Sequence, residues 1–167
     1  MYKMLAFICF VFAGAIIGVK LSDRLRAGRD CCREIHAMLT QICVMIRYRS
    51  LDVYEIIREL HTSEVCGNLE FLRNLPDVYE PGTNFHDVWD KAVSEDDLLS
   101  GEERSILLSF GSTLGTSDAD GQISSAESAI ERIRELERIR SEEYSRKGKL
   151  YRSVGMLFGT MVGILII

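Results

Sequence analysis

Apolar side chains gather at the two ends of this 167-residue chain and recur at helical spacing between those ends. Residues 4–19 and 153–167 contain no charged side chain. Between them, apolar residues return every three or four positions, which is the period of an amphipathic helix. No convincing run of alternating β-branched residues indicates a strand. The pattern predicts an all-α fold, with an antiparallel bundle of about six helices between two short terminal transmembrane helices.

Capping and turn residues divide the middle of the chain into segments. Asp52 and Ser100 each precede a Glu at capping-box spacing, which predicts a helix start at both. The first and last helices should be long, adjacent and antiparallel. The predicted segments are a helix over 21–49 continuous with the first apolar end, short helices over 52–60 and 65–75, a loop over 76–84, a short helix over 85–93, a helix from Ser100 to Gly115, and a last helix from Asp118 or Asp120.

The apolar ends are expected to anchor the chain in a membrane. The predicted parts are an anchor over 1–21, a cytoplasmic helical-bundle domain over 22–149, and a C-terminal transmembrane helix over 150–167. Basic side chains flank each end where it meets the middle, which favours a cytoplasmic location for the middle. These basic residues include Lys20, Arg24, Arg26, Lys149 and Arg152.

The first apolar segment has a second interpretation. Ala13-Gly14-Ala15 has the small residues of a signal-peptidase site, so the segment also resembles a cleaved signal peptide. The basic residues that follow it resist export and favour an uncleaved anchor.

Glycines repeat every four residues in both apolar ends, at Gly14 and Gly18 and at Gly155, Gly159 and Gly163. This spacing places each set on one helix face. A small-residue face lets another helix approach closely in lipid. The glycines are therefore predicted to pack the two anchors on each other or on another protomer, which makes a homo-oligomer the expectation.

The net charge of −5 is unevenly distributed. Residues 52–120 carry 16 acidic and 4 basic side chains, a net charge of −12, whereas both flanking regions are basic. The acidic block is either a solubilising surface or a docking surface for a basic partner. Its densest part supplies the candidate docking residues, Glu95, Asp96, Asp97, Glu102 and Glu103. Nucleic acid is not an expected partner, because no separate basic patch forms.

No catalytic constellation is visible, so we expect no enzyme activity, cofactor or metal. Cys31 and Cys32 are adjacent and lie near arginines, but no general base follows at a known motif spacing. Asp118 and Asp120 resemble the start of a calcium loop without its remaining ligands. Capping of the last helix accounts for them better.

Two stretches carry a family resemblance. They are Leu114-Gly115-Thr116-Ser117-Asp118 followed by Gln122, and Lys149-Leu150-Tyr151-Arg152-Ser153-Val154-Gly155. With the two short anchors and the all-α middle, they resemble the stage III sporulation protein AB family of endospore-forming Gram-positive bacteria. The soluble part of that family is similar to the F-family platform proteins of type II secretion and type IV pilus systems.

The resemblance implies a non-enzymatic inner-membrane platform component of the channel complex between mother cell and forespore. Its implied location is the mother-cell side of the outer forespore membrane. Its implied partners are the sporulation ATPase of the same operon and other membrane proteins of the channel complex. The secretion relatives usually carry two such domains and three membrane spans, whereas this chain has one domain, so a complete platform would need self-association or other subunits. The alternative is a membrane-anchored helical scaffold or regulator unrelated to secretion.

Overall fold

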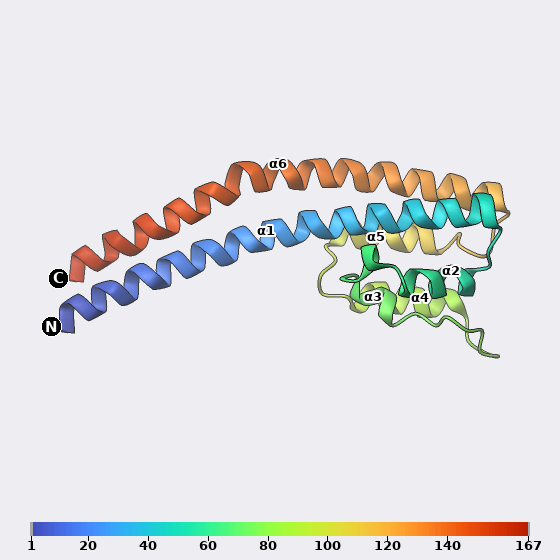
Figure 1. Ribbon diagram of the computed structural model, residues 1–167, viewed down its shortest axis with the longest axis horizontal. Coiled ribbons are helices and arrows are strands. Elements are labelled where there is room, and N and C mark those ends of the chain that lie inside the picture. The colour runs from blue at the N-terminus through green and yellow to red at the C-terminus, as the bar shows by residue number, and fades with distance from the viewer. Residues whose placement is uncertain (1, 167) are drawn as a thin grey trace. The chain divides into compact units, whose positions relative to one another are not determined.

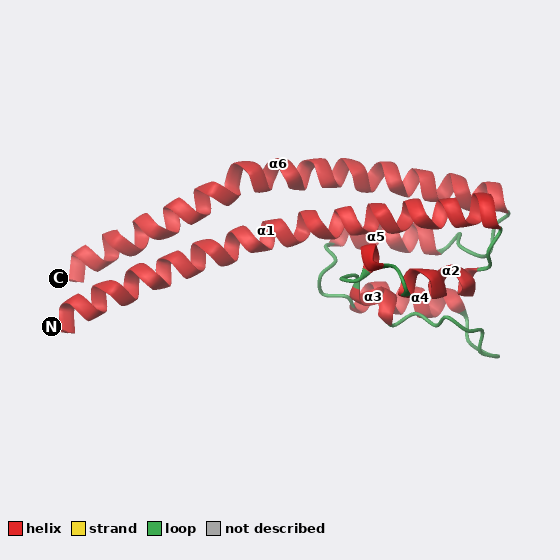
Figure 2. Ribbon diagram, viewed as in Figure 1, coloured by secondary structure: helices red, strands yellow, loops and turns green. Residues whose placement is uncertain are grey.

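The computed structural model describes the backbone of residues 2–166 as helices and loops, without a strand in that range (Figure 2). Side chains are described for these residues except 2–11, 14, 15, 65, 149, 152, 155, 156, 158–160 and 162–166. The all-α prediction is confirmed. Within the described residues, no helix contains a stretch long and apolar enough to cross a membrane.

Six α-helices and one 3₁₀ turn follow one another along the described backbone (Figure 1). They are α1 (Tyr2–Arg49), α2 (Val53–His61), the 3₁₀ turn η1 (Glu64–Cys66), α3 (Glu70–Arg73), α4 (Phe85–Glu95), α5 (Gly101–Gly111) and α6 (Ala119–Ile166). The predicted continuity of the first helix with the first apolar end is confirmed, because α1 has no break between these bounds.

The chain divides into two compact units, and the first joins Met1–Arg29 to Arg138–Ile167. The α1 and α6 segments of this unit are antiparallel. A Cβ atom built on Gly28 would lie 3.2 Å from Nη1 of Arg140, and one built on Gly148 would lie 3.3 Å from Oγ of Ser22. Such short distances mean that the two helices pack closely at glycine positions.

The second unit, Asp30–Glu137, contains the hydrophobic core. In it α4 packs on α5, and α3 packs on both α2 and α4. An ion pair between Arg47 and Glu127 joins its α1 and α6 segments. The largest fully buried side chains are Trp89, Phe71, Phe110, Ile35, Met38, Leu39, Ile42, Ile56, Ile57, Leu60, Leu107 and Leu114.

Both predicted capping boxes form. At the start of α2, the Asp52 carboxylate accepts a hydrogen bond from the Glu55 amide at 2.9 Å, and the Glu55 carboxylate accepts one from the Asp52 amide at 3.1 Å. Ser100 and Glu103 make the same reciprocal pair at the start of α5. These contacts satisfy amides that have no partner inside the helix, which is why the pattern located both helix starts.

The segment over 65–75 differs from the prediction of one helix. It folds instead as η1 and the single turn α3. Its backbone turns by hydrogen bonds between residues three apart, from Cys66 to Ser63, Leu69 to Cys66, Leu72 to Leu69 and Leu75 to Leu72. Residues three apart eclipse one another in such turns. The four apolar residues at this spacing are therefore all buried.

The end of α5 is also different from the prediction. The helix ends at Gly111 rather than Gly115, and turns fill 112–116. Gly115 does take the left-handed conformation, with φ of 80°, which explains the glycine there. It closes the turn before α6 rather than ending α5.

Trp89 lies at the centre of the core and sets where α4 and α5 meet. Its ring makes edge-to-face contacts with Phe71 and Phe110, with centroids 5.7 and 6.0 Å apart. Its indole N–H donates to the Leu107 carbonyl at 2.9 Å. The α5 backbone approaches the indole so closely that a Cβ atom on Gly111 would lie 2.2 Å from Cδ1 and Nε1.

We predict that Gly111→Ala destabilises the bundle and that Gly101→Ala does not. Trp89 is fully buried and hydrogen-bonded, so the added methyl group forces a backbone shift that costs about 1–3 kcal/mol or more. Gly101 is helical with nothing within 4 Å of the same position, so alanine there is neutral or stabilising by about 0.5 kcal/mol. Urea unfolding of the full chain in mild detergent, followed by the fluorescence of the single tryptophan, measures both. Equal midpoints for the two variants would contradict the packing.

Candidate functional site

The turn between α4 and α5, residues 96–100, contains two of the five candidate acidic residues, and the other three lie beside it in α4 and α5. Buried hydrogen bonds hold this turn in place. Asp96 is 5% exposed. Its Oδ2 accepts a hydrogen bond from the Phe71 amide at 3.0 Å, and its Oδ1 accepts one from the Leu98 amide at 2.8 Å. A buried carboxylate needs such donors to offset lost hydration. Asp96 therefore ties the turn to α3.

Glu103 holds the other end of the turn. It is 1% exposed, and its Oε2 accepts a hydrogen bond from the Ser100 amide at 2.7 Å. The Cys32 thiol of α1 donates to its Oε1 at 3.0 Å. The carboxylate thus caps α5 and also joins it to α1.

Arg104 makes a third set of contacts that hold this turn, and no sequence pattern indicated them. Its guanidinium donates to the carbonyls of Val93 at 3.2 Å, Asp96 at 2.9 Å and Leu99 at 3.4 Å. These carbonyls lie at the end of α4 and in the turn, where no helical partner satisfies them. One cation therefore closes the end of α4 onto the start of α5.

The outer side of this fixed turn is exposed. Glu95, Asp97 and Glu102 are exposed, and Leu98 among them is 59% exposed. We call these four residues the acidic turn surface. These four exposed side chains lie in and beside a backbone segment that is held by Asp96, Glu103 and Arg104.

The structure corrects the candidate docking set. Asp96 and Glu103 are buried and bond to the protein itself, so neither is placed to meet a partner. Sequence position alone did not separate acids that cap a turn from acids that face solvent. The capping-box pattern at Ser100 was the available signal for Glu103, and no comparable pattern marked Asp96.

The sequence also predicts a helix joint at four residues of the first family-resemblance stretch, and the structure brings them together between α5 and α6: Leu114, Gly115, Asp118 and Gln122. The Gln122 carbonyl oxygen accepts a hydrogen bond from the Gly115 amide at 3.1 Å, and its amide nitrogen donates to the Ser117 carbonyl at 2.8 Å. Asp118 caps α6 by accepting a hydrogen bond from the Gly121 amide at 3.0 Å. Leu114 is fully buried below them. These contacts therefore fix the backbone between α5 and α6.

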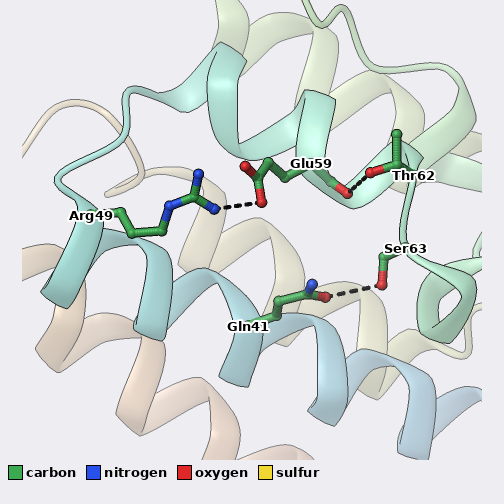
Figure 3. Close-up of polar contacts among 5 residues, drawn as sticks. All are labelled: Gln41, Arg49, Glu59, Thr62 and Ser63. Atoms are coloured by element: carbon green, nitrogen blue, oxygen red, sulfur yellow. Dashed lines mark hydrogen bonds and ion pairs between the residues drawn. The ribbon is translucent and has the colours of Figure 1, made fainter.

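Polar contacts also fix α2 and the residues after it on α1 (Figure 3). Arg49 and Glu59 form an ion pair at 2.6 Å. Ser63 donates to the Gln41 side chain at 3.2 Å, and Thr62 donates to the Glu59 carbonyl at 2.8 Å. The hydrogen bond from Arg49 lowers the pKa of the Glu59 carboxyl. This surface pair is thus present at neutral pH and is lost only as the pH falls through that lowered pKa.

Of the predicted anchor residues, Gly18 is buried in the first unit, whereas Lys20, Arg24 and Arg26 are exposed. Ser22, one turn after Gly18 on the same face, is buried near Gly148 of α6. Ser22 of α1 therefore packs close to Gly148 of α6 in the same chain. The side chains at Lys149 and Arg152, and the sites Gly14, Gly155, Gly159 and Gly163, lie outside the described residues.

The described thiols are placed for packing. Cys32, Cys43 and Cys66 are buried, and burial raises the pKa of the Cys66 thiol, which makes it a poor nucleophile. Among the described residues, the structure shows no group of three or more His, Cys, Asp or Glu side chains that could hold a metal ion.

Comparison with known proteins identifies a family. The family model described as stage III sporulation protein AB matches residues 3–167. Searches of curated protein sequences and of solved structures gave no significant match.

We predict that Asp96→Ala destabilises the protein by about 2–3 kcal/mol, because it leaves two amides, one of them buried, without an acceptor. Asp97→Ala removes the same charge from the exposed neighbour and should change stability by no more than about 0.5 kcal/mol. Urea unfolding of the two variants measures the difference. Equal losses would mean that charge, and not the contacts of Asp96, stabilises the turn.

Proposed function

Because this chain belongs to the stage III sporulation protein AB family, we propose that it is a membrane-anchored platform component that acts in stage III of sporulation. In this proposal, the apolar segments 4–19 and 153–167 are the two anchors. The helical core of the second unit is the cytoplasmic domain. The chain then has no enzymatic role and serves as an attachment site in a secretion-like channel complex between mother cell and forespore.

The acidic turn surface carries the proposal. We propose that it docks the sporulation ATPase of the same operon, through a basic surface on that ATPase. Complementary charge speeds association and selects orientation, and a buried apolar anchor supplies much of the binding energy at protein interfaces. Leu98 is the apolar candidate, and Glu95, Asp97 and Glu102 supply the charge around it.

Self-association remains part of the proposal. In this proposal, further copies of the chain, or other membrane proteins of the channel complex, complete the platform. The glycines of the two apolar segments are the proposed contacts, between the two anchors or between protomers. A helical scaffold or regulator unrelated to secretion is the alternative, and it would share the anchors without requiring the ATPase.

Binding of the ATPase to variants of the full chain in nanodiscs tests the docking surface. We predict that the triple reversal of Glu95, Asp97 and Glu102 to Lys, or Leu98→Ala alone, weakens binding by tenfold or more, because one hot-spot side chain contributes about 2 kcal/mol. The matched control reverses Glu80, Asp87 and Asp90, which are also exposed and change the net charge equally. Equal weakening in both triple variants would assign binding to overall charge, and full binding by both test variants would refute docking at this surface.

A reporter inserted at Gly121, together with N-terminal sequencing, tests the anchors. We expect cytoplasmic reporter activity and an intact first segment, because the basic flanks resist export. Cleavage near Ala15, or an exported reporter, would replace the anchor with a signal peptide.

A further inference from the structure

A groove of about 300 Å³ lies between α5 and the first turns of α6 in the second unit. Phe110 and Ala129 are apolar parts of its lining, and both are buried. Its polar lining includes Ser109 of α5 and Ser124 and Ser128 of α6. Arg132, one turn after Ser128, also lines it. The small side chains of α6 leave the groove open to solvent.

The polar groups of this groove differ in whether they have a partner among the described residues. Ser125, the remaining serine of the lining, accepts a hydrogen bond from the Thr113 hydroxyl at 2.8 Å. By contrast, no contact is found for the hydroxyls of Ser109, Ser124 and Ser128 or for the Arg132 guanidinium among the described residues.

Glu135, three residues after Arg132 on α6, does not line the groove. Other carboxylates on or beside this part of α6 are engaged elsewhere. Glu131 forms an ion pair with Arg134 at 2.6 Å, and Glu127 pairs with Arg47 of α1. Asp118, at the start of α6, accepts a hydrogen bond from the Gly121 amide. None of the three carboxylates lines the groove.

The lining is therefore rich in donors and has no anionic group. A guanidinium donates through several N–H groups and accepts nothing, and serine hydroxyls rotate to donate. We propose that this groove binds an oxyanion, a phosphate or a carboxylate group, held by Arg132 and the hydroxyls of Ser124 and Ser128.

The site is separate from the acidic turn surface, and its charge preference is opposite. It gives the bundle a second binding position, for an anionic ligand, in addition to the proposed docking of a basic partner. Failure of either proposal leaves the other standing.

Amide chemical shifts of the full chain in detergent, titrated with sodium phosphate and separately with sodium acetate, test the site. Sodium chloride at equal ionic strength is the reference. We expect saturable shifts over residues 124–132 with at least one oxyanion, and the stronger response identifies phosphate or carboxylate as the preferred group. Arg132→Gln should weaken this binding roughly tenfold, because it removes a charge-assisted hydrogen bond.

Two further variants distinguish binding at the groove from an effect of the overall charge of the protein. Ser124→Ala with Ser128→Ala keeps the charge and the helix and should weaken binding roughly fivefold, since two hydroxyl donors are lost. Arg134→Gln removes the same charge as Arg132→Gln from an arginine outside the groove and should bind as the native chain does. Shifts matched by chloride, or equal effects of Arg132→Gln and Arg134→Gln, would overturn the proposal.

Discussion

The turn between α4 and α5 depends on two carboxylates that are buried in the protein. A buried charge is costly unless hydrogen bonds replace its hydration, and Asp96 and Glu103 each meet this condition with two donors. The donors come from α1, α3 and the turn itself, so one short segment links three parts of the core. The guanidinium of Arg104 satisfies the carbonyls on the same segment. The outward side chains of the turn therefore project from a backbone with little freedom to rearrange.

The first unit follows a different packing rule. Its two helices meet at small residues, with Ser22 against Gly148 and Gly28 against the Arg140 side chain. The Arg29 guanidinium lies over the Tyr144 ring, 4.8 Å from its centroid, a contact that adds to the pairing. Close approach of backbones replaces interdigitation of large side chains here.

Local signals predicted the helix starts, because a capping box consists of residues three apart and can be recognised without the fold. Loop positions followed equally well from Pro76 and Gly82. The burial of Asp96 could not be predicted, since its donor at Phe71 is 25 residues away in sequence. The prediction of one helix over 65–75 was wrong for a related reason. The spacing of Leu69, Leu72 and Leu75 fits both a helix and a run of 3₁₀ turns. The groove at Arg132 depends on α5 lying beside α6, which no local pattern encodes.

Preorganisation decides how the acidic turn surface would contribute to binding. Ordering a mobile loop costs free energy on association, and the contacts of Asp96, Glu103 and Arg104 meet that cost during folding. The exposed carboxylates lie at the rim, where charge acts mainly on the rate of encounter and is screened by salt. Leu98 is the only one of the four side chains whose burial would release apolar surface from water. Steering and anchoring thus fall to different residues of one rigid turn, and a partner suited to it needs an apolar pocket surrounded by basic side chains.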